Sequence, residues 1–399
     1  MSNSKLALYG GIPTRPKDRF IVFGKPKIEE SEIEAVVECM RGGWIGTGPR
    51  VSQFETDFAS FKNIKHSIAL NSCTAALHLS MRAAGIGVGD EVITTPMTFC
   101  ATINSIIHSG ATPILADCLK GTMNIDSAEI ESKITSKTKA ILPVHFAGRC
   151  CDMDAIMRIA RTYDLLVIED CAHAIESEYH RQPAGTFGDI GCFSFYVTKN
   201  IITGEGGMAI TKDDRFAGRI KALGLHGMSK DAWKRFSDDG YKHYQVIHAG
   251  FKYNMMDMQA VIGIQQLKRV NSYWEKRKII WSMYNKSFSD LRCFTPEDSE
   301  DNTKHAYHLY TPLIDINKIK KSRDWVLSAL TAENIGVGVH YQPVHLHPYY
   351  QKTYGWKKGD FPNAEWIGER TISLPLSPAL QEEEIEDVIT AFRKVMTRK

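Results

Sequence analysis

The sequence predicts an α/β fold: a large domain around a mainly parallel sheet, followed by a smaller α+β domain. From about residue 29 to residue 210, short apolar runs alternate with stretches whose apolar residues recur at helical spacing. This alternation is typical of a parallel sheet covered by helices on both faces. After about residue 230 the pattern changes, and no low-complexity linker intervenes. We therefore expect a large domain over residues 1–265 and a tightly packed small domain over residues 266–399.

The N-terminal elements are expected to be helical. Ser31 is a candidate N-cap for a helix that stops at Gly42 and Gly43. The apolar positions of this helix are Ile33, Val36, Val37 and Met40. A second helical face consists of Phe54, Phe58 and Phe61.

The apolar runs expected to form strands span residues 68–70, 92–93, 113–116, 140–144, 165–168, 192–196 and 208–210. Helical spacing predicts helices at residues 74–84, 152–163, 251–267 and 382–396. Residues 233–248 are polar and aromatic, which is typical of a surface loop or a subunit contact.

Composition excludes several classes of protein. The chain has 399 residues, enough for a large core, with 43% hydrophobic and 24% charged residues, as in ordinary globular enzymes. Its 49 basic and 46 acidic side chains leave a net charge of +3 and are spread along the sequence. This balance gives no support for nucleic acid or an anionic membrane as a partner.

Targeting signals and metal motifs are not evident. The N-terminal apolar stretch is too short for a signal peptide, and no apolar run is long enough to span a bilayer. The nine cysteines form no C-x-x-C pair, which indicates reduced thiols and predicts a cytoplasmic protein. His340, His345 and His347 lack cysteines or carboxylates at matching spacing, so we expect no metal.

Two residues carry the strongest chemical signal. Asp170 closes the run 165–169, at the carboxyl end of an expected strand, where ligands bind in such sheets. Lys199 follows 29 residues later (199 − 170), after one more short strand. A pyridoxal phosphate (PLP) enzyme needs such a pair, because the lysine forms a Schiff base and the carboxylate keeps the pyridine nitrogen protonated. From these residues alone, a hairpin with Lys199 in water stays open as the alternative.

Glycines and hydroxyls surround this pair. The glycine-rich segment 204–207 lets the backbone turn sharply and approach a flat ring closely. Ser194 adds a hydroxyl for a phosphate, and residues 71–74 lead from a strand directly into a helix N-terminus, a ready phosphate site. Plain helix capping by Ser72 and Thr74 is the alternative.

Ordered blocks of the sequence resemble the DegT/StrS group of sugar-nucleotide aminotransferases. They read GWIGTGP at 43–49, TPMTFCAT at 95–102, EDCAHA at 169–174, GDIGCFSF at 188–195, TKN at 198–200, GEGG at 204–207 and GFKYNM at 250–255. The likeness runs in order from about residue 20 to residue 395. It departs at Glu176-Ser177, where many relatives have small residues, and at Ile201-Ile202, where a polar pair is more usual.

The resemblance implies the aspartate-aminotransferase-like PLP fold (fold type I) and a homodimer with two active sites at the subunit interface. It implies that Lys199 carries the cofactor, that Asp170 pairs with the pyridine nitrogen, and that His173 lies near the phenolic oxygen as a third catalytic residue. The other positions that match cofactor-binding ones are Phe99 on the ring, Cys73, Thr74 and Ser194 at the phosphate, and Asn254 from the neighbouring subunit. Positions that match substrate-binding ones are Trp44, Ile45, Gly46, His340 and Tyr341.

The activity implied is transamination of a keto sugar on a nucleoside diphosphate, favouring a 4-keto hexose, with glutamate as amino donor. Such amino sugars serve polysaccharide or antibiotic biosynthesis. One alternative is a pyridoxamine-dependent sugar dehydratase of the same family, against which Lys199 argues, because those relatives replace the lysine. The other is a non-catalytic regulator that retains the fold; no helix-turn-helix segment or basic face supports it.

Overall fold

The computed structural model describes residues 5–229, 244–297 and 300–397. At its centre lies a seven-stranded sheet of order β1-β9-β8-β5-β4-β2-β3. β9 is antiparallel to both neighbours, and every other adjacent pair is parallel. The strands are β1 (His66–Leu70), β2 (Glu91–Thr94), β3 (Thr112–Leu115), β4 (Thr138–Ile141), β5 (Leu166–Asp170), β8 (Ile190–Ser194) and β9 (Gly207–Thr211). The mainly parallel sheet is thus confirmed.

Each face of the sheet has its own apolar core, because successive strand residues point to opposite faces. On one face α2 (Pro49–Lys62) and α6 (Met153–Tyr163) pack over Val167 and Phe193. The Phe58 ring of α2 lies 5.2 Å from that of Phe193. On the other face α3 (Cys73–Ala83) and α7 (Asp214–Gly224) pack over Ile168 and Cys192. The sheet is therefore covered on both faces, as expected.

The remaining α-helices are α1 (Glu30–Arg41), α4 (Cys100–Ser109), α5 (Ser127–Ile130), α8 (Asp257–Phe288), α9 (Ile316–Ile319), α10 (Arg323–Ala332), α11 (Pro348–Tyr354), α12 (Pro362–Gly368) and α13 (Glu382–Thr397). Two small sheets pair β6 (Glu178–Tyr179) with β7 (Gln182–Pro183) and β10 (Cys293–Phe294) with β11 (Leu313–Ile314). None of these described helices is both long and apolar enough to cross a membrane.

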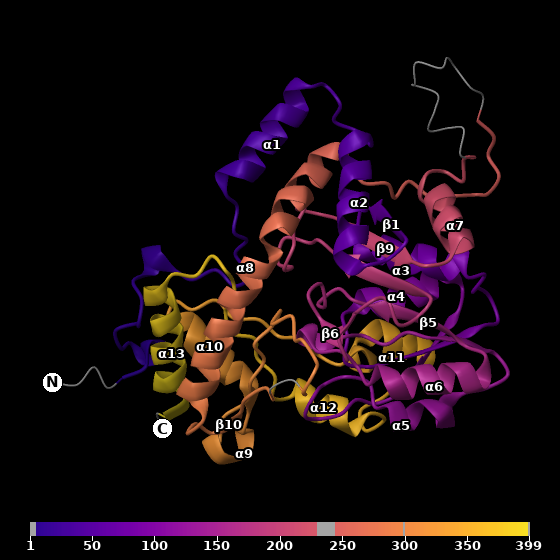
Figure 1. Ribbon diagram of the computed structural model, residues 1–399. Helices are drawn as coiled ribbons and strands as arrows, with labels where there is room; N and C mark the ends of the chain where they lie inside the picture. The colour runs from indigo at the N-terminus through magenta and orange to yellow at the C-terminus, as the bar shows by residue number, and fades with distance from the viewer. Residues whose placement is uncertain (1–4, 230–243, 298–299, 398–399) are drawn as a thin grey trace.

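The long helix α8 connects the two parts of the molecule. Figure 1 shows it passing from beside α1 and α2 to the region of α9, α10 and α13. Its later residues, including Trp281 and Tyr284, enter a core shared with α10 and α13. α11 returns to the sheet side, where Tyr350 donates its hydroxyl to Asn104 at 2.7 Å. The boundary expected at residue 266 falls inside the continuous α8, and the division into domains stays a prediction.

The start of α1 differs from the prediction. Glu29, not Ser31, is the N-cap, and it forms a capping box with Glu32, so the assignment of Ser31 was wrong. A carboxylate at each end of this box satisfies two backbone N–H groups, which a serine inside the helix cannot do. Ile33 and Met40, two of the apolar positions that predicted this helix, are 49% and 57% exposed in the single chain.

Residues 251–256 are extended rather than helical, and α8 begins at Asp257. The N–H groups of Phe251 and Tyr253 donate to the carbonyls of Leu223 and Gly224 at the end of α7. These tertiary hydrogen bonds override the helical apolar spacing. Most of the stretch 233–248, expected to be a surface loop or a subunit contact, lies outside the described residues.

Candidate active site

Three strand ends meet at one edge of the sheet. β1, β5 and β8 point in the same direction, so their carboxyl ends at Leu70, Asp170 and Ser194 face the same side. Lys199 follows β8 in a turn in which its N–H donates to the carbonyl of Tyr196 at 2.8 Å. The two residues with the strongest sequence signal are therefore brought to the edge where ligands bind in such sheets.

The amine of Lys199 is electrostatically unusual. Burial lowers its pKa to about 8, while the nearby Cys73 and Asp170 oppose that shift. These three side chains thus lie close enough to influence one another's charge. An amine with this pKa is partly neutral near physiological pH, and only the neutral form attacks a carbonyl.

Asp170 is buried and held from two sides. Oδ2 accepts a hydrogen bond of 2.8 Å from the hydroxyl of Thr102, and Oδ1 accepts one of 3.1 Å from the N–H of Ala172. Burial raises the pKa of Asp170, and these two donors oppose the rise. Thr102 is in turn bonded to Thr98 at 2.7 Å. The carboxylate is therefore held in one orientation.

The N-terminus of α3 lies beside this pair. Ser72 caps the helix by accepting the N–H of Ala75 at 3.0 Å, so the capping alternative holds for Ser72. Cys73 and Thr74 occupy the first helical turn, whose N–H groups favour an anion. A Cβ at Gly207 would lie 2.3 Å from the backbone of Ser72, so β9 can approach this turn closely only with glycine there.

His173 is neutral and oriented. Its Nδ1 accepts the N–H of Ala147 at 3.2 Å, which leaves the proton on Nε2, 3.1 Å from the Tyr341 hydroxyl. Burial, and then the charge of Lys199, hold its pKa well below the usual range. The Tyr341 ring also lies 6.0 Å from that of Phe99, which is 57% exposed. The predicted residues His173, Tyr341 and Phe99 are thus brought together.

His340 joins the same group. Its Nδ1 lies 2.7 Å from the hydroxyl of Ser373. Burial, and then Lys199, lower its pKa to about 3, so its ring is neutral. A neutral imidazole offers a substrate a hydrogen-bond donor or acceptor without a charge.

Trp44, Ile45, Gly46 and Asn254 form a second group. Trp44 and Ile45 are half exposed, and the Trp44 indole donates to the carbonyl of Thr47 at 3.1 Å. Asn254 donates its side-chain amide to the Thr47 hydroxyl, beside the end of β1. Trp44 and Asn254 line one cavity of about 280 Å³.

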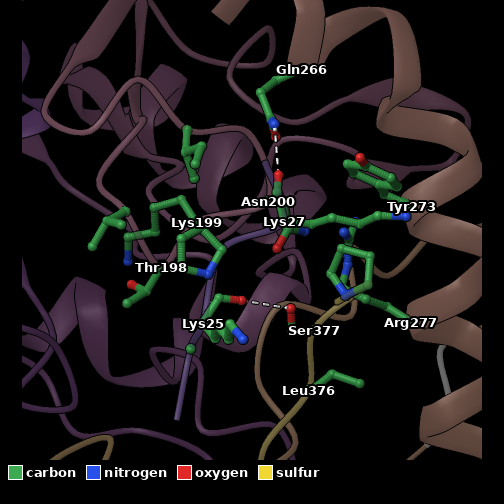
Figure 2. Close-up of a pocket in the computed structure, with 15 residues that line it drawn as sticks. Lys25, Lys27, Thr198, Lys199, Asn200, Gln266, Tyr273, Arg277, Leu376 and Ser377 are labelled. Atoms are coloured by element: carbon green, nitrogen blue, oxygen red, sulfur yellow. Dashed lines mark hydrogen bonds between the residues drawn. The ribbon is translucent and has the colours of Figure 1, made fainter. Parts of the chain in front are cut away.

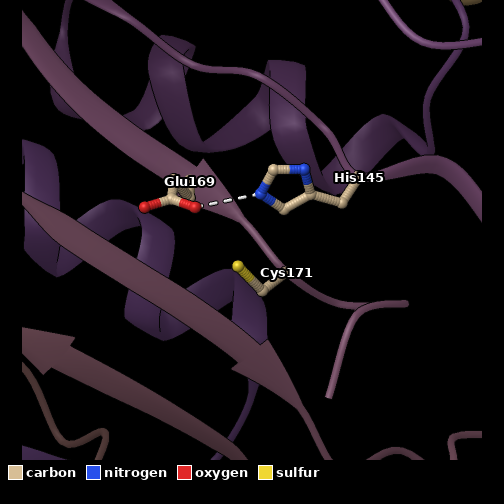
Figure 3. Close-up of side chains that lie close together, drawn as sticks. All are labelled: His145, Glu169 and Cys171. Carbon is tan, nitrogen blue, oxygen red and sulfur yellow. Dashed lines mark hydrogen bonds and ion pairs between the residues drawn. The ribbon is translucent and has the colours of Figure 1, made fainter. Parts of the chain in front are cut away.

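Figure 3 shows a buried cluster at the end of β5 that could be mistaken for a metal site. It consists of His145, Glu169 and Cys171. The two oxygens of Glu169 accept the N–H groups of residues 185, 187 and 188 at 2.7–2.8 Å, and Oε2 also lies 3.0 Å from Nε2 of His145. Because Nδ1 of His145 accepts the N–H of Cys151, Nε2 carries the proton and donates. Backbone binding, not metal binding, explains the cluster.

Sequence reasoning missed several residues at this edge. Thr102 lies inside the block TPMTFCAT that carries the family resemblance. Its position in the first turn of α4, four residues after Thr98, was the signal that could have identified it. His308, whose ring lies 4.4 Å from that of His173, carried no signal. Glu176 stood out in the sequence only as a departure from the family pattern, and no local spacing indicated its partners Arg277 and Asn200.

The donor set fits PLP by its chemistry. Lys199 offers an amine for the aldehyde, and Asp170 a buried carboxylate for the pyridine nitrogen. The start of α3 and the Ser194 hydroxyl suit the phosphate. Phe99 is an exposed aromatic that suits the face of a ring.

The chain matches a known protein family over most of its length. Residues 26–393 match the model of the DegT/DnrJ/EryC1/StrS aminotransferase family. The chain belongs to this family. The assignment confirms the resemblance, the predicted enzyme class of PLP-dependent sugar aminotransferase, and PLP as the cofactor.

Relatives match over nearly the whole chain. SpsC, the spore coat polysaccharide biosynthesis protein of Bacillus subtilis, is 46% identical over 381 residues, or 95% of this chain and 98% of SpsC. The putative sugar aminotransferase Spr1654 from Streptococcus pneumoniae, in its PMP-form, superposes with a TM-score of 0.87 at 33% identity, covering 94% of this chain and 98% of that one. DesI, solved in the presence of its TDP-sugar product, gives a TM-score of 0.87 at 28% identity, covering 100% and 97%. The expected aspartate-aminotransferase-like fold is confirmed.

Proposed function

We propose that this aminotransferase moves the amino group of glutamate to the keto group of a hexose linked to a nucleoside diphosphate. A 4-keto hexose is the favoured substrate, and the products are 2-oxoglutarate and the nucleotide-linked amino sugar. The observation that carries the proposal is that the sheet topology brings Lys199, after β8, and the buried Asp170, at the end of β5, to the same carboxyl edge.

Each residue has a defined task. When bound, PLP supplies an electron sink for the C–H bond that is broken next to the amino group. Asp170 keeps a proton on the pyridine nitrogen, because a buried anion raises the proton affinity of a neighbouring base. Lys199, as a neutral amine, would accept the proton from the substrate carbon and would then be the acid that returns it. His173 and Phe99 would border the cofactor ring, and Cys73, Thr74 and Ser194 would hold its phosphate.

The relatives support a nucleotide sugar. DesI was solved with a TDP-sugar product, and SpsC is named for a polysaccharide pathway. In this chain Trp44, Ile45, Gly46, His340 and Tyr341 would contact the sugar nucleotide. Half-exposed Trp44 and Ile45 offer apolar surface for a base or sugar, and neutral His340 offers a hydrogen bond.

A homodimer with shared active sites is part of the proposal. Ile33, Val37 and Met40 form an apolar stripe on α1 that is 49%, 37% and 57% exposed, and Trp44 and Ile45 continue it. A contiguous exposed apolar patch fits a subunit contact. Asn254 would then reach the phosphate in the partner's site.

We also propose a cytoplasmic location. All nine cysteines are free, and seven of them are buried. Unpaired thiols in this number suit a reducing compartment.

Two other functions receive less support. A pyridoxamine-dependent dehydratase has no use for a Schiff-base lysine, yet Lys199 is placed beside Asp170 with its pKa lowered to about 8. A regulator that merely retains the fold would not need Asp170 fixed by Thr102 and Ala172.

The decisive experiment incubates the purified PLP enzyme with glutamate and a panel of nucleotide-linked 3-keto and 4-keto hexoses. We expect 2-oxoglutarate and an amino sugar in equal amounts from one member of the panel. No turnover with any member would overturn the substrate class.

Lys199→Ala should lose both turnover and the visible absorbance band of lysine-bound cofactor. A persisting band would show that another lysine holds PLP.

A further inference from the structure

A chain of buried polar side chains leads from α8 to the residue that follows Lys199. Arg277 on α8 donates Nη2 to Oε1 of Glu176, and both side chains are at most 2% exposed. Oε2 of Glu176 accepts the side-chain amide of Asn200 at 2.7 Å. Each oxygen of the carboxylate therefore serves a different partner.

Asn200 is fixed in one orientation by this chain. Its amide nitrogen also donates to the carbonyl of Ala306 at 3.0 Å, which uses both of its hydrogens. Its Oδ1 lies 3.0 Å from Nδ1 of His308. Because Asn200 is the next residue after Lys199, holding its side chain also restricts the backbone turn that carries Lys199.

Arg277 borders a small cavity next to Lys199. Figure 2 shows Lys199, Asn200 and Arg277 around it, with Tyr273 on α8. The cavity is small, about 30 Å³, and it is lined by polar groups that include Lys199, Asn200 and Arg277. Nε and Nη1 of Arg277 have no protein partner among the described residues. Glu176 is therefore the anion that this guanidinium meets.

Stability alone is a weak reason for such a pair. Burying two charges costs desolvation energy that their attraction only partly repays, and apolar side chains of similar size often stabilise a core as well. A buried ion pair does, however, fix geometry strongly, because each group has few other partners. Here the fixed group adjoins the reactive lysine.

We propose that Glu176 is a positioning residue for Lys199: anchored by Arg277, it locks the amide of Asn200 and thereby the turn that presents the lysine amine. The inference rests on the role of Lys199 in the proposed function. Glu176 touches neither substrate nor cofactor in this scheme, and it acts only through Asn200.

Replacing Glu176 by glutamine distinguishes its hydrogen bond with Asn200 from its ion pair with Arg277. Glu176→Gln leaves one acceptor oxygen for two donors, and the charged Arg277 takes it in preference to Asn200. Glu176→Gln/Arg277→Met removes that competitor, so the oxygen returns to Asn200. Asn200→Ala removes the link and leaves the buried Glu176–Arg277 ion pair in place. The test therefore compares these three variants with the parent.

The readout is the pH midpoint at which the apo-enzyme reacts with PLP to give the visible band. We expect the parent midpoint to follow the Lys199 amine, whose pKa is about 8. Loosening the turn admits water and moves the amine toward its ordinary pKa, so Glu176→Gln and Asn200→Ala should each raise the midpoint by about one unit. In the loaded enzyme kcat should fall about tenfold with the KM for glutamate unchanged.

Controls separate positioning from general destabilisation. Glu333→Gln alters another buried carboxylate, which binds Lys394 far from Lys199 along the chain, and should lower the unfolding temperature without moving the midpoint. Adding Asn200→Ala to Glu176→Gln should shift the midpoint no further, since both break the same link.

Several results would overturn the proposal. These are an unchanged midpoint in Asn200→Ala, a full shift that remains in Glu176→Gln/Arg277→Met, or an equal shift in Glu333→Gln. If Glu176→Gln fails to fold, Asn200→Ala decides alone. A visible band that survives Lys199→Ala would instead contradict the proposed function, so the two failures are distinct.

Discussion

Oγ1 of Thr102 and Oδ2 of Asp170 lie 2.8 Å apart, joined by a hydrogen bond that the hydroxyl donates. Both side chains are buried. Burial raises the pKa of Asp170, and Thr102 is the strongest of the groups that oppose this rise. Thr102 therefore helps to keep Asp170 anionic in the interior, which pairing with a protonated pyridine nitrogen requires.

Thr102→Val should weaken PLP binding by about tenfold, because the loss of a hydrogen bond to a charged group raises the pKa of Asp170 further. The loss should be greater at pH 6 than at pH 8, since protonation of Asp170 removes its charge at the lower pH. Titration of the apo-enzyme with PLP, followed by visible absorbance, measures both effects. Thr102→Ser retains the hydroxyl and should bind as the parent does. A loss of affinity relative to the parent that is the same at pH 6 and pH 8 would refute the role.

Gly48→Ala should weaken binding of the sugar nucleotide and leave stability nearly unchanged. A Cβ at residue 48 would lie 1.7 Å from Nε1 of Trp44, so the indole must move. Because Trp44 is half exposed, its ring can swing outward at little cost to folding. We expect KM for the sugar nucleotide to rise several-fold, to roughly the extent that one lost apolar contact implies.

The matched control for this change is Gly218→Ala on α7, where an added Cβ meets nothing within 4 Å. It should leave KM as in the parent. Steady-state kinetics at saturating glutamate give KM, and thermal unfolding gives stability. A normal KM in Gly48→Ala would show that the position of Trp44 does not matter for substrate binding.

The central sheet and the edge that carries the site could be predicted from the sequence. Residues 165–168 and 208–210 are short apolar runs whose side chains pack into the cores on both faces of the sheet, which is typical of a strand covered by two layers. Parallel direction then places Asp170 and the start of α3 at one edge. Local pattern and simple topology sufficed for both conclusions.

The residues that the sequence analysis missed and the elements that it misplaced depend on contacts between residues far apart in the sequence. Glu176 and Arg277 meet across 101 positions, and Thr102 and Asp170 across 68. No local spacing indicates such pairs. Helical spacing misplaced the start of α8 for the same reason, because the N–H of Phe251 is bound by the end of α7. The apolar residues of α1 recur at the spacing of a helix with one apolar face, yet Ile33, Val37 and Met40 on that face are exposed in the single chain.

Glu169→Gln should lower the free energy of unfolding by about 2–4 kcal/mol, because an amide group would face backbone donors that the carboxylate now satisfies. The mutated side chain is fully buried and accepts three backbone N–H groups. Urea unfolding measures the loss. Glu178→Gln, which alters a half-exposed pair with Lys304, should change stability by less than about 0.5 kcal/mol.

The hydrogen bonds in the cluster of His145, Glu169 and Cys171 predict that removing metal ions will not affect the fold. Since the oxygens of Glu169 and both ring nitrogens of His145 are engaged by protein groups, treatment with EDTA should not change the unfolding temperature. A fall after EDTA that zinc restores would contradict the structural role.

Stability should decline as the pH falls below about 6.5, and His305 should account for part of this decline. Its ring is 4% exposed, its Nδ1 accepts the N–H of Tyr307 at 2.7 Å, and burial lowers its pKa to about 3. In the unfolded chain a histidine titrates near pH 6.5, so between these values only the unfolded state binds the proton. The contribution of neutral His305 to the free energy of unfolding is complete above pH 6.5 and is lost as the pH falls, by about 1.4 kcal/mol between pH 7.5 and pH 5.5.

Urea unfolding of the apo-enzyme at these two pH values measures the loss. His305→Gln keeps an acceptor for Tyr307 but cannot titrate, so its stability should depend on pH less by that amount; an unchanged pH dependence would mean that His305 is protonated in the folded state.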